Sequence, residues 1–248
     1  MINRDLYKGS FSKDNIPSWS CPTCNSGIIT TTKEKFLDGH TASTTAIIKE
    51  DWFDPEDMAE LIYTVFLQCS NPKCLEIVMN VGSGFVERDY DEHDWSWISY
   101  FKPKFFYPPL MIFQIPKNTP ENVRESIISS FSLVFTNPAS SANQIRIAIE
   151  CLLTHLKVKQ YHIVKGKRNK LTLHRRIELL PEKYKKIKEV CLAIKWLGNA
   201  GSHCEDKITF DDVFDGYDML SFVLEELYDN KHAHVKKLAN KINARKGV

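Results

Sequence analysis

Two pairs of closely spaced cysteines are the residues whose type and spacing most directly permit chemistry. They occur in Cys21-Pro-Thr-Cys24 and Cys69-Ser-Asn-Pro-Lys-Cys74. Proline and asparagine favour tight turns, and a tight turn allows both sulfurs of a pair to face one ion. Together the pairs supply four thiolates, which form the closed tetrahedral set of a structural zinc site and leave no open position for catalysis. The sequence therefore predicts a structural Zn²⁺ bound by these four cysteines.

Four free thiols are the alternative interpretation of these pairs. The second pair encloses four residues, and the two pairs lie farther apart than in compact zinc ribbons. Zinc is favoured because the N-terminal segment lacks the pattern of a secretory signal and no run approaches the ~18 apolar residues of a membrane span. We therefore expect a cytoplasmic protein without membrane contact, where cysteines stay reduced and regular spacing indicates metal binding.

A second segment of interest is KWLGNAGSH, from Lys195 to His203. It follows an apolar helical pattern, and Gly198-Asn199 is typical of a helix C-terminus, so we expect the helix to stop there. In a structural interpretation, His203 bonds a neighbouring group and holds the loop that follows. In a functional interpretation, Asn199 and His203 line a polar cleft that contacts a phosphate or nucleotide.

The elements that must position these residues change in character along the chain. Residues 16–115 are rich in short β-type segments such as GIITTT, TASTTAIIK, LIYTVFLQC and EIVMNV, with one helical turn at DPEDMAEL. Beyond a proline-rich aromatic crossing, apolar residues recur at helical spacing. We therefore expect an α+β protein, with a β-rich, zinc-ribbon-like domain over 1–116 and an α-helical bundle over 117–248.

The second half also contains a strongly basic window. No acidic residue occurs between Cys151 and Ile177, although the net charge of the whole chain is only +2. A solvated loop is the ordinary explanation of such a run, but its cations can also follow a phosphate backbone, with Tyr161 available for base stacking. The expected nucleic-acid-binding residues are Lys165, Lys167, Arg168, Lys170, Arg175 and Arg176.

The order of these features resembles a bacterial domain family of unknown function, placed among the HEPN-like helical domains and often preceded by a zinc ribbon. The resemblance rests on the cysteine pairs, the Tyr107-Pro108-Pro109 crossing, the segments SANQIRIAIECLL and LHRRIELL, and KWLGNAGSH. It implies a HEPN-like bundle that forms a homodimer, in the setting of bacterial restriction, toxin–antitoxin and phage-defence systems. It further implies RNA or another nucleic acid, or a partner defence protein, as the binding partner.

The resemblance also implies a candidate activity, metal-independent cleavage of RNA by a dimer. Active HEPN ribonucleases carry an arginine separated from a following histidine by four to six residues; the arginine stabilises phosphate charge and the histidine moves a proton. This chain keeps Asn199 and His203, but Trp196, Leu197 and Gly198 occupy the positions of that arginine. The catalytic candidates implied are His203, Asn199, Lys195 and Arg146, the last two as substitute cations.

Three functions follow as competing hypotheses. The first is a dimeric zinc-ribbon and HEPN-like protein that binds nucleic acid or a partner; the second is a divergent endoribonuclease; the third is a regulatory or antitoxin-like subunit. Several enzyme classes receive no support, because the sequence lacks a Gly-rich phosphate loop ending in Gly-Lys-Ser/Thr, a His-Glu-x-x-His helix and a Gly-x-Ser-x-Gly elbow.

Overall fold

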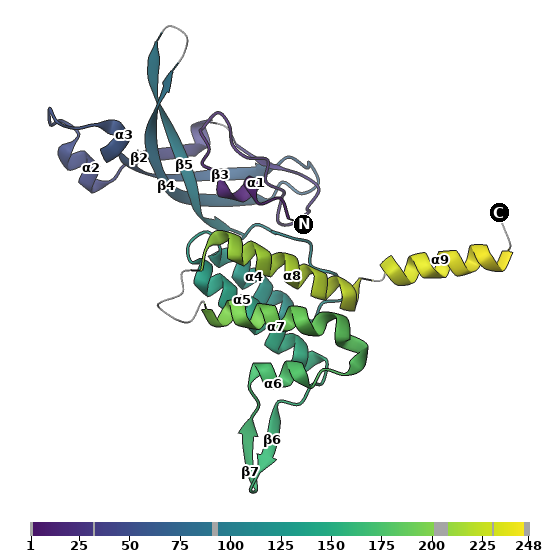
Figure 1. Ribbon diagram of the computed structural model, residues 1–248. Helices are drawn as coiled ribbons and strands as arrows, with labels where there is room; N and C mark the ends of the chain where they lie inside the picture. Colours follow the sequence, from purple (N-terminus) through teal and green to yellow (C-terminus); the bar gives the residue numbers. More distant parts are fainter. Residues whose placement is uncertain (1, 32, 91–93, 201–207, 230, 246–248) are drawn as a thin grey trace. The chain divides into compact units, whose positions relative to one another are not determined.

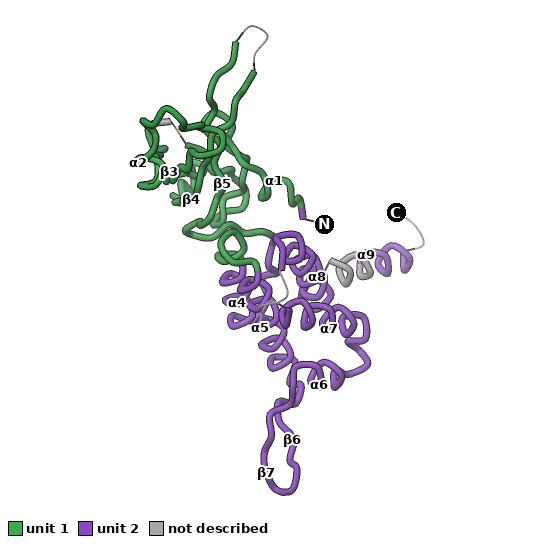
Figure 2. The backbone as a smooth tube through the Cα atoms, turned by 60° about the vertical axis from the view of Figure 1, so that its left-hand side comes forward, with its two compact units in different colours: residues 1, 3–112, 131–138 green, residues 2, 113–130, 139–248 purple. Residues whose placement is uncertain are grey.

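The computed structural model describes residues 2–31, 33–90, 94–200, 208–229 and 231–245 (Figure 1). The chain divides into two compact units (Figure 2). Unit 1 contains residues 3–112 and 131–138, and unit 2 contains residues 113–130 and 139–248. The first unit is built on an antiparallel sheet and the second on helices, so the expected α+β class is confirmed.

Unit 1 has an antiparallel sheet in which β3 is central to the topology. Its order in the described residues is β1-β3-β4-β5, and β2 pairs with the same edge of β3 as β1. The β4–β5 pairing continues past the end of β3, to Tyr90 opposite Trp95, so these strands extend as a two-stranded ribbon (Figure 1). The strands are β1 (Ile29–Thr30), β2 (Phe36–His40), β3 (Glu60–Cys69), β4 (Ile77–Tyr90) and β5 (Trp95–Tyr107).

The core of unit 1 forms because β3 alternates between buried and exposed side chains, as a strand with one covered face should. Aromatic rings cover that face. Phe36 stacks on Tyr63 with ring centroids 5.1 Å apart, and Trp19 meets Phe106 edge-on at 5.0 Å. The hydroxyl of Tyr63 donates to Asn80 Oδ1 at 2.6 Å, which satisfies the polar end of a buried ring.

Short helices complete unit 1: α1 (Asp5–Lys8), the 3₁₀ turn η1 (Lys33–Lys35), α2 (Ala42–Ile47) and α3 (Pro55–Met58). The helical turn expected at 54–61 is present as α3, but the strand expected in TASTTAIIK is wrong. That segment forms α2 because the Thr41 side chain accepts a hydrogen bond from the Thr44 backbone N–H, an N-cap that β-type residue content does not reveal.

Unit 2 is a helical bundle with a projecting hairpin. Its helices are α4 (Glu121–Leu133), α5 (Pro138–His155), α6 (Leu173–Glu178), α7 (Lys185–Ala200), α8 (Phe210–Tyr228) and α9 (Lys231–Arg245), with a 3₁₀ turn η2 (Glu182–Tyr184). The apolar residues expected at helical spacing supply the core of α5, α7 and α8. Inside it, the hydroxyls of Ser130, Ser141 and Tyr217 bond one another at 2.8–3.0 Å, so no buried hydroxyl of the three lacks a partner.

The hairpin consists of β6 (Tyr161–Val164) and β7 (Lys167–Lys170), and it projects beyond α6, away from the other helices of unit 2 (Figure 1). Lys165 and Gly166 both have positive φ, which is the backbone of a two-residue type I′ turn. Across the described residues, none of the helices has the length and apolar character needed to cross a membrane.

The described part of α7 ends at Ala200, two residues past Gly198, so Gly198 itself lies within the helix. Gly198 lies where α7 approaches α5 closely: a Cβ at this position would be 2.4 Å from the Cβ of Arg146 and 3.0 Å from the carbonyl oxygen of Ala142. The glycine is therefore explained by helix packing and not by a C-terminal cap. The sequence could not distinguish these roles, since both require the absence of a side chain.

Candidate functional site

The four expected cysteines lie together in unit 1. Their sulfurs are all within 4.8 Å of one another, with 3.8 Å between the Sγ atoms of Cys21 and Cys74 and 3.6 Å between those of Cys24 and Cys69. Each of these two contacts joins one residue of the first pair to one of the second, over a sequence separation of about 50 residues. The four cysteines thus form a cluster that could hold a metal ion.

Local turns aim the sulfurs of each pair at the cluster. After the first pair, Asn25 N–H donates to the carbonyl of Cys21 at 2.9 Å, and Asn25 has positive φ. After the second pair, Leu75 N–H donates to the carbonyl of Asn71 at 3.0 Å, and Leu75 also has positive φ. Each turn therefore reverses the chain immediately after a cysteine pair.

Gly27 allows the two turns to meet. A Cβ at this position would lie 2.6 Å from Cys69 Sγ and 2.9 Å from the backbone nitrogen of Asn71, both too close for real atoms. Asn71 N–H in turn points at Cys69 Sγ, at 3.4 Å. The sequence analysis did not single out Gly27, because a glycine three residues after Cys24 has no distinctive pattern.

The electrostatic environments of the cysteines differ. Hydrogen bonds from the Ser26 side chain and from the backbone of Ser26 and Gly27 lower the pKa of Cys24 to about 5, which favours its thiolate form. Burial raises the pKa of Cys69 to about 12. A metal cation at the centre would favour the thiolate form of all four residues, because binding of the cation and loss of the thiol protons are coupled.

The hairpin of unit 2 presents most of the expected nucleic-acid-binding residues. Lys165, Lys167, Arg168 and Lys170 are exposed on it. The guanidinium of Arg168 lies 3.8 Å from the centre of the Tyr161 ring, a cation–π contact between the two strands. The segment VKGKRNK of the basic window thus lies in an exposed hairpin, and its charged residues follow the register of β6 and β7.

The other two expected binding residues lie on α6 and have partners there. Arg175 is exposed, and its Nη1 pairs with Glu178 Oε2 at 2.7 Å. Arg176 is only 4% exposed; its Nη2 donates to Thr154 Oγ1 at 2.9 Å and its Nη1 to the carbonyl of Glu150 at 3.3 Å. Arg176 is therefore part of the packing between α6 and α5 and is not on the exposed basic surface.

Among the catalytic candidates, Arg146 is brought against the end of α7 by its contact with Gly198. Its guanidinium donates to Glu150 Oε1 at 2.6 Å and to Asn143 Oδ1 at 3.1 Å. Asn199 is half-buried on the last turn of α7, and His203 lies outside the described residues.

Lys195 does not stand out into solvent as a substitute cation would. It is 8% exposed, its Nζ lies over the ring of the exposed Trp196, and burial lowers its pKa. The structure therefore brings Arg146 and Asn199 to the same region of the α5–α7 contact, but the positive charge of Lys195 is directed onto a ring.

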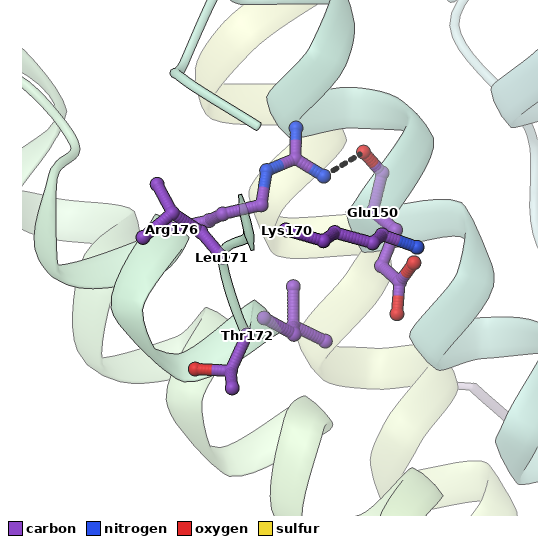
Figure 3. A pocket seen from close by; sticks show the side chains of 6 residues that line it. Glu150, Lys170, Leu171, Thr172 and Arg176 are labelled. Carbon is purple, nitrogen blue, oxygen red and sulfur yellow. Dashed lines mark hydrogen bonds between the residues drawn. The ribbon is translucent and has the colours of Figure 1, made fainter. Parts of the chain in front are cut away.

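A pocket that the sequence analysis missed lies at the base of the hairpin, and it has a volume of about 270 Å³ (Figure 3). Six residues from β7, α5, α6 and the β7–α6 connection line it: Glu150, Lys170, Leu171, Thr172, Leu173 and Arg176. The sequence indicated the two cations of this pocket, because Lys170 and Arg176 lie in the basic window. The contribution of Glu150 from α5 depends on tertiary packing.

Comparison with known proteins gives two matches to family models. Residues 9–106 are similar to a domain of unknown function (DUF8608), and residues 129–245 are similar to another domain of unknown function (DUF4145). No curated protein and no solved structure matches the chain. The two matched segments correspond closely to the cysteine-containing unit and the helical unit.

Proposed function

We propose that this protein binds nucleic acid through the β6–β7 hairpin, and that a zinc-ribbon-like centre stabilises the unit that accompanies it. The observation that carries the proposal is the hairpin itself. Four cations project from an ordered, exposed two-stranded ribbon within a window that has no acidic residue. Such a surface attracts a polyanion by releasing its counterions.

The apolar residues of the hairpin support the same function. Ile163 is 77% exposed and Val164 46%, beside the half-covered ring of Tyr161. A two-stranded hairpin with both faces in water is marginally stable, so a binding partner that covers it would add stability. Nucleic acid offers both phosphates for the lysines and base or sugar surfaces for the apolar side chains.

For the cysteine cluster we propose Zn²⁺ as the metal. A tetrahedron with Zn–S bonds of ~2.3 Å has S···S edges of ~3.8 Å, and the two sulfur contacts across the cluster are 3.8 and 3.6 Å. Four thiolates favour zinc over magnesium or calcium, which prefer oxygen ligands. With four protein ligands the centre would be structural, holding together turns that are far apart in sequence.

The test of nucleic-acid binding is fluorescence anisotropy with labelled duplex DNA, single-stranded DNA and single-stranded RNA over a series of salt concentrations. The triple variant Lys165→Gln, Lys167→Gln, Arg168→Gln should weaken binding and make its logarithmic salt dependence shallower by ~2–3, the value for three lost phosphate contacts. The control variant substitutes glutamine for three exposed lysines elsewhere, Lys35, Lys49 and Lys117. Equal binding by both triple variants would refute the proposal.

A second candidate function, RNA cleavage, is favoured by one specific contact. Gly198 brings Arg146 of α5 against the last turn of α7, which also carries Asn199. Cleavage of RNA by the wild type in EDTA buffer, lost in a folded His203→Ala variant, would establish it. Retention of cleavage in that variant would assign the activity to a contaminant.

The homodimer and the phage-defence setting follow from the HEPN resemblance as part of the same proposal. Native mass spectrometry of the purified protein should give twice the chain mass of 28.7 kDa. A regulatory or antitoxin-like role predicts instead that an enzyme such as a nuclease co-purifies with the chain.

A further inference from the structure

The pocket at the base of the hairpin has an excess of positive charge. Arg176 and Lys170 line it together with one carboxylate, that of Glu150. That carboxylate is also paired with Arg146, at 2.6 Å. Two cations therefore line the pocket with one carboxylate, and this balance favours a negatively charged ligand.

Arg176 supplies an independent indication of a ligand. Its side chain is more than nine-tenths buried, and two of its nitrogens have protein partners. Its Nε–H is buried and has no hydrogen-bond partner among the described residues. A buried donor without a partner is costly, and an acceptor bound in the pocket would remove that cost.

The position of the pocket identifies the kind of anion. Lys170 is the last residue of β7, so the pocket opens where the basic hairpin joins the bundle (Figure 3). A nucleic acid strand that follows the cations of β7 would reach this point. Leu171 and Leu173 add an apolar part to the lining, which suits a sugar beside the charged group.

We propose that this pocket binds a phosphate group of the nucleic acid, with Lys170 and the Arg176 Nε–H as donors. The identity of the phosphate as part of a nucleic acid rests on the proposed function, whereas the binding of phosphate by the pocket does not. Glu150 opposes the anion, and this limits affinity for free phosphate.

The test is isothermal titration calorimetry of the full chain with inorganic phosphate, at constant ionic strength maintained with chloride. Lys170→Gln should weaken phosphate binding about tenfold, the effect of one charge-assisted hydrogen bond. Lys159→Gln is the matched control, because Lys159 has the same charge and is exposed in the same basic window but does not line the pocket. It should leave the affinity for inorganic phosphate unchanged.

A second variant, which does not remove a cation, should change the affinity for phosphate in the opposite direction. Glu150→Gln should tighten phosphate binding about threefold, because it removes the competing carboxylate. Absence of phosphate binding by the wild type, or equal weakening by Lys170→Gln and Lys159→Gln, would overturn the pocket proposal. Thermal denaturation of each variant identifies any loss of affinity that is due to unfolding, and such a loss would not count as support.

The outcomes separate this inference from the proposed function. Phosphate binding that depends on Lys170, in a protein that fails to bind any oligonucleotide, would keep the pocket and refute the nucleic-acid function. Oligonucleotide binding that depends on the hairpin but not on Lys170 would support the nucleic-acid function and refute the pocket as a site for a nucleic-acid phosphate.

Discussion

Gly27→Ala is the substitution whose effect on the cysteine cluster can be worked out most directly. The added methyl would lie 2.6 Å from Cys69 Sγ, 2.9 Å from Asn71 N and 3.0 Å from Asn71 Cβ. None of these neighbours is the free end of a flexible side chain: one is a metal-ligand candidate and two belong to the turn that positions it. The two turns must therefore move apart.

The expected magnitude has two parts. Overpacking of this kind destabilises a folded protein by ~1–3 kcal/mol. Displacement of a ligating sulfur should also weaken metal binding, by ~10–100-fold if it resembles the loss of an outer-shell contact. Both effects should appear together, because the same sulfur takes part in both.

The matched control is Gly39→Ala in β2, where an added Cβ would meet nothing within 4 Å. Its stability should equal or slightly exceed that of the wild type, since alanine restricts the unfolded chain more than glycine does. Zinc affinity is measured by competition with a chromophoric chelator, and stability by denaturant unfolding. If Gly27→Ala matched Gly39→Ala in both measurements, the close approach of the two turns would be refuted.

Three further predictions concern metal removal, helix packing and helix capping. Chelation of the bound metal should release one zinc per chain and lower the thermal unfolding midpoint, measured by circular dichroism, and an unchanged midpoint would argue against a structural centre. Gly198→Ala should destabilise the chain in denaturant unfolding, because the 2.4 Å contact with Arg146 Cβ costs ~1–3 kcal/mol and outweighs the ~1 kcal/mol gain in helix propensity; a stabilised variant would contradict this. Thr209→Ala should lose ~1 kcal/mol at neutral pH, because it removes the capping box with Asp212. Hydrogen bonds from Thr209 lower the pKa of Asp212, so this stabilisation is present above the unfolded-state pKa of ~4 and is lost as the pH falls through the folded-state pKa; Asp212→Asn should lack that part of the acid dependence.

Much of the fold follows from local patterns in the sequence. The alternation of β3 and the helical spacing on α5, α7 and α8 each predict the observed element, because burial of one face requires that periodicity. The prediction of a strand for TASTTAIIK was wrong. Its residue types favour a strand, but the Thr41 cap stabilises the helix α2. The preference of single residues for strand or helix is a weak guide where one capping hydrogen bond can favour the other structure.

The candidate sites show the same division. The spacing of the cysteines predicted the cluster, because each pair carries its own turn residues. The basic window predicted the charges of the hairpin, but not the formation of β6 and β7 or the register of their pairing. Arg176 belongs to the same window and yet is buried against α5, which no local pattern indicated.

The sequence by itself determined which groups this protein can use: four thiols in two turns, a window of cations without acids, and three apolar helix faces. The tertiary structure alone decided which of those groups meet. Gly27 permits two turns about 50 residues apart to converge on one centre, and Gly198 permits Arg146 to reach the end of α7. Glu150 joins Lys170 and Arg176 at one pocket because α5 packs beside α6. Local periodicity reflects the burial of single elements, whereas these contacts depend on the close approach of elements distant in sequence, which only the packed core determines.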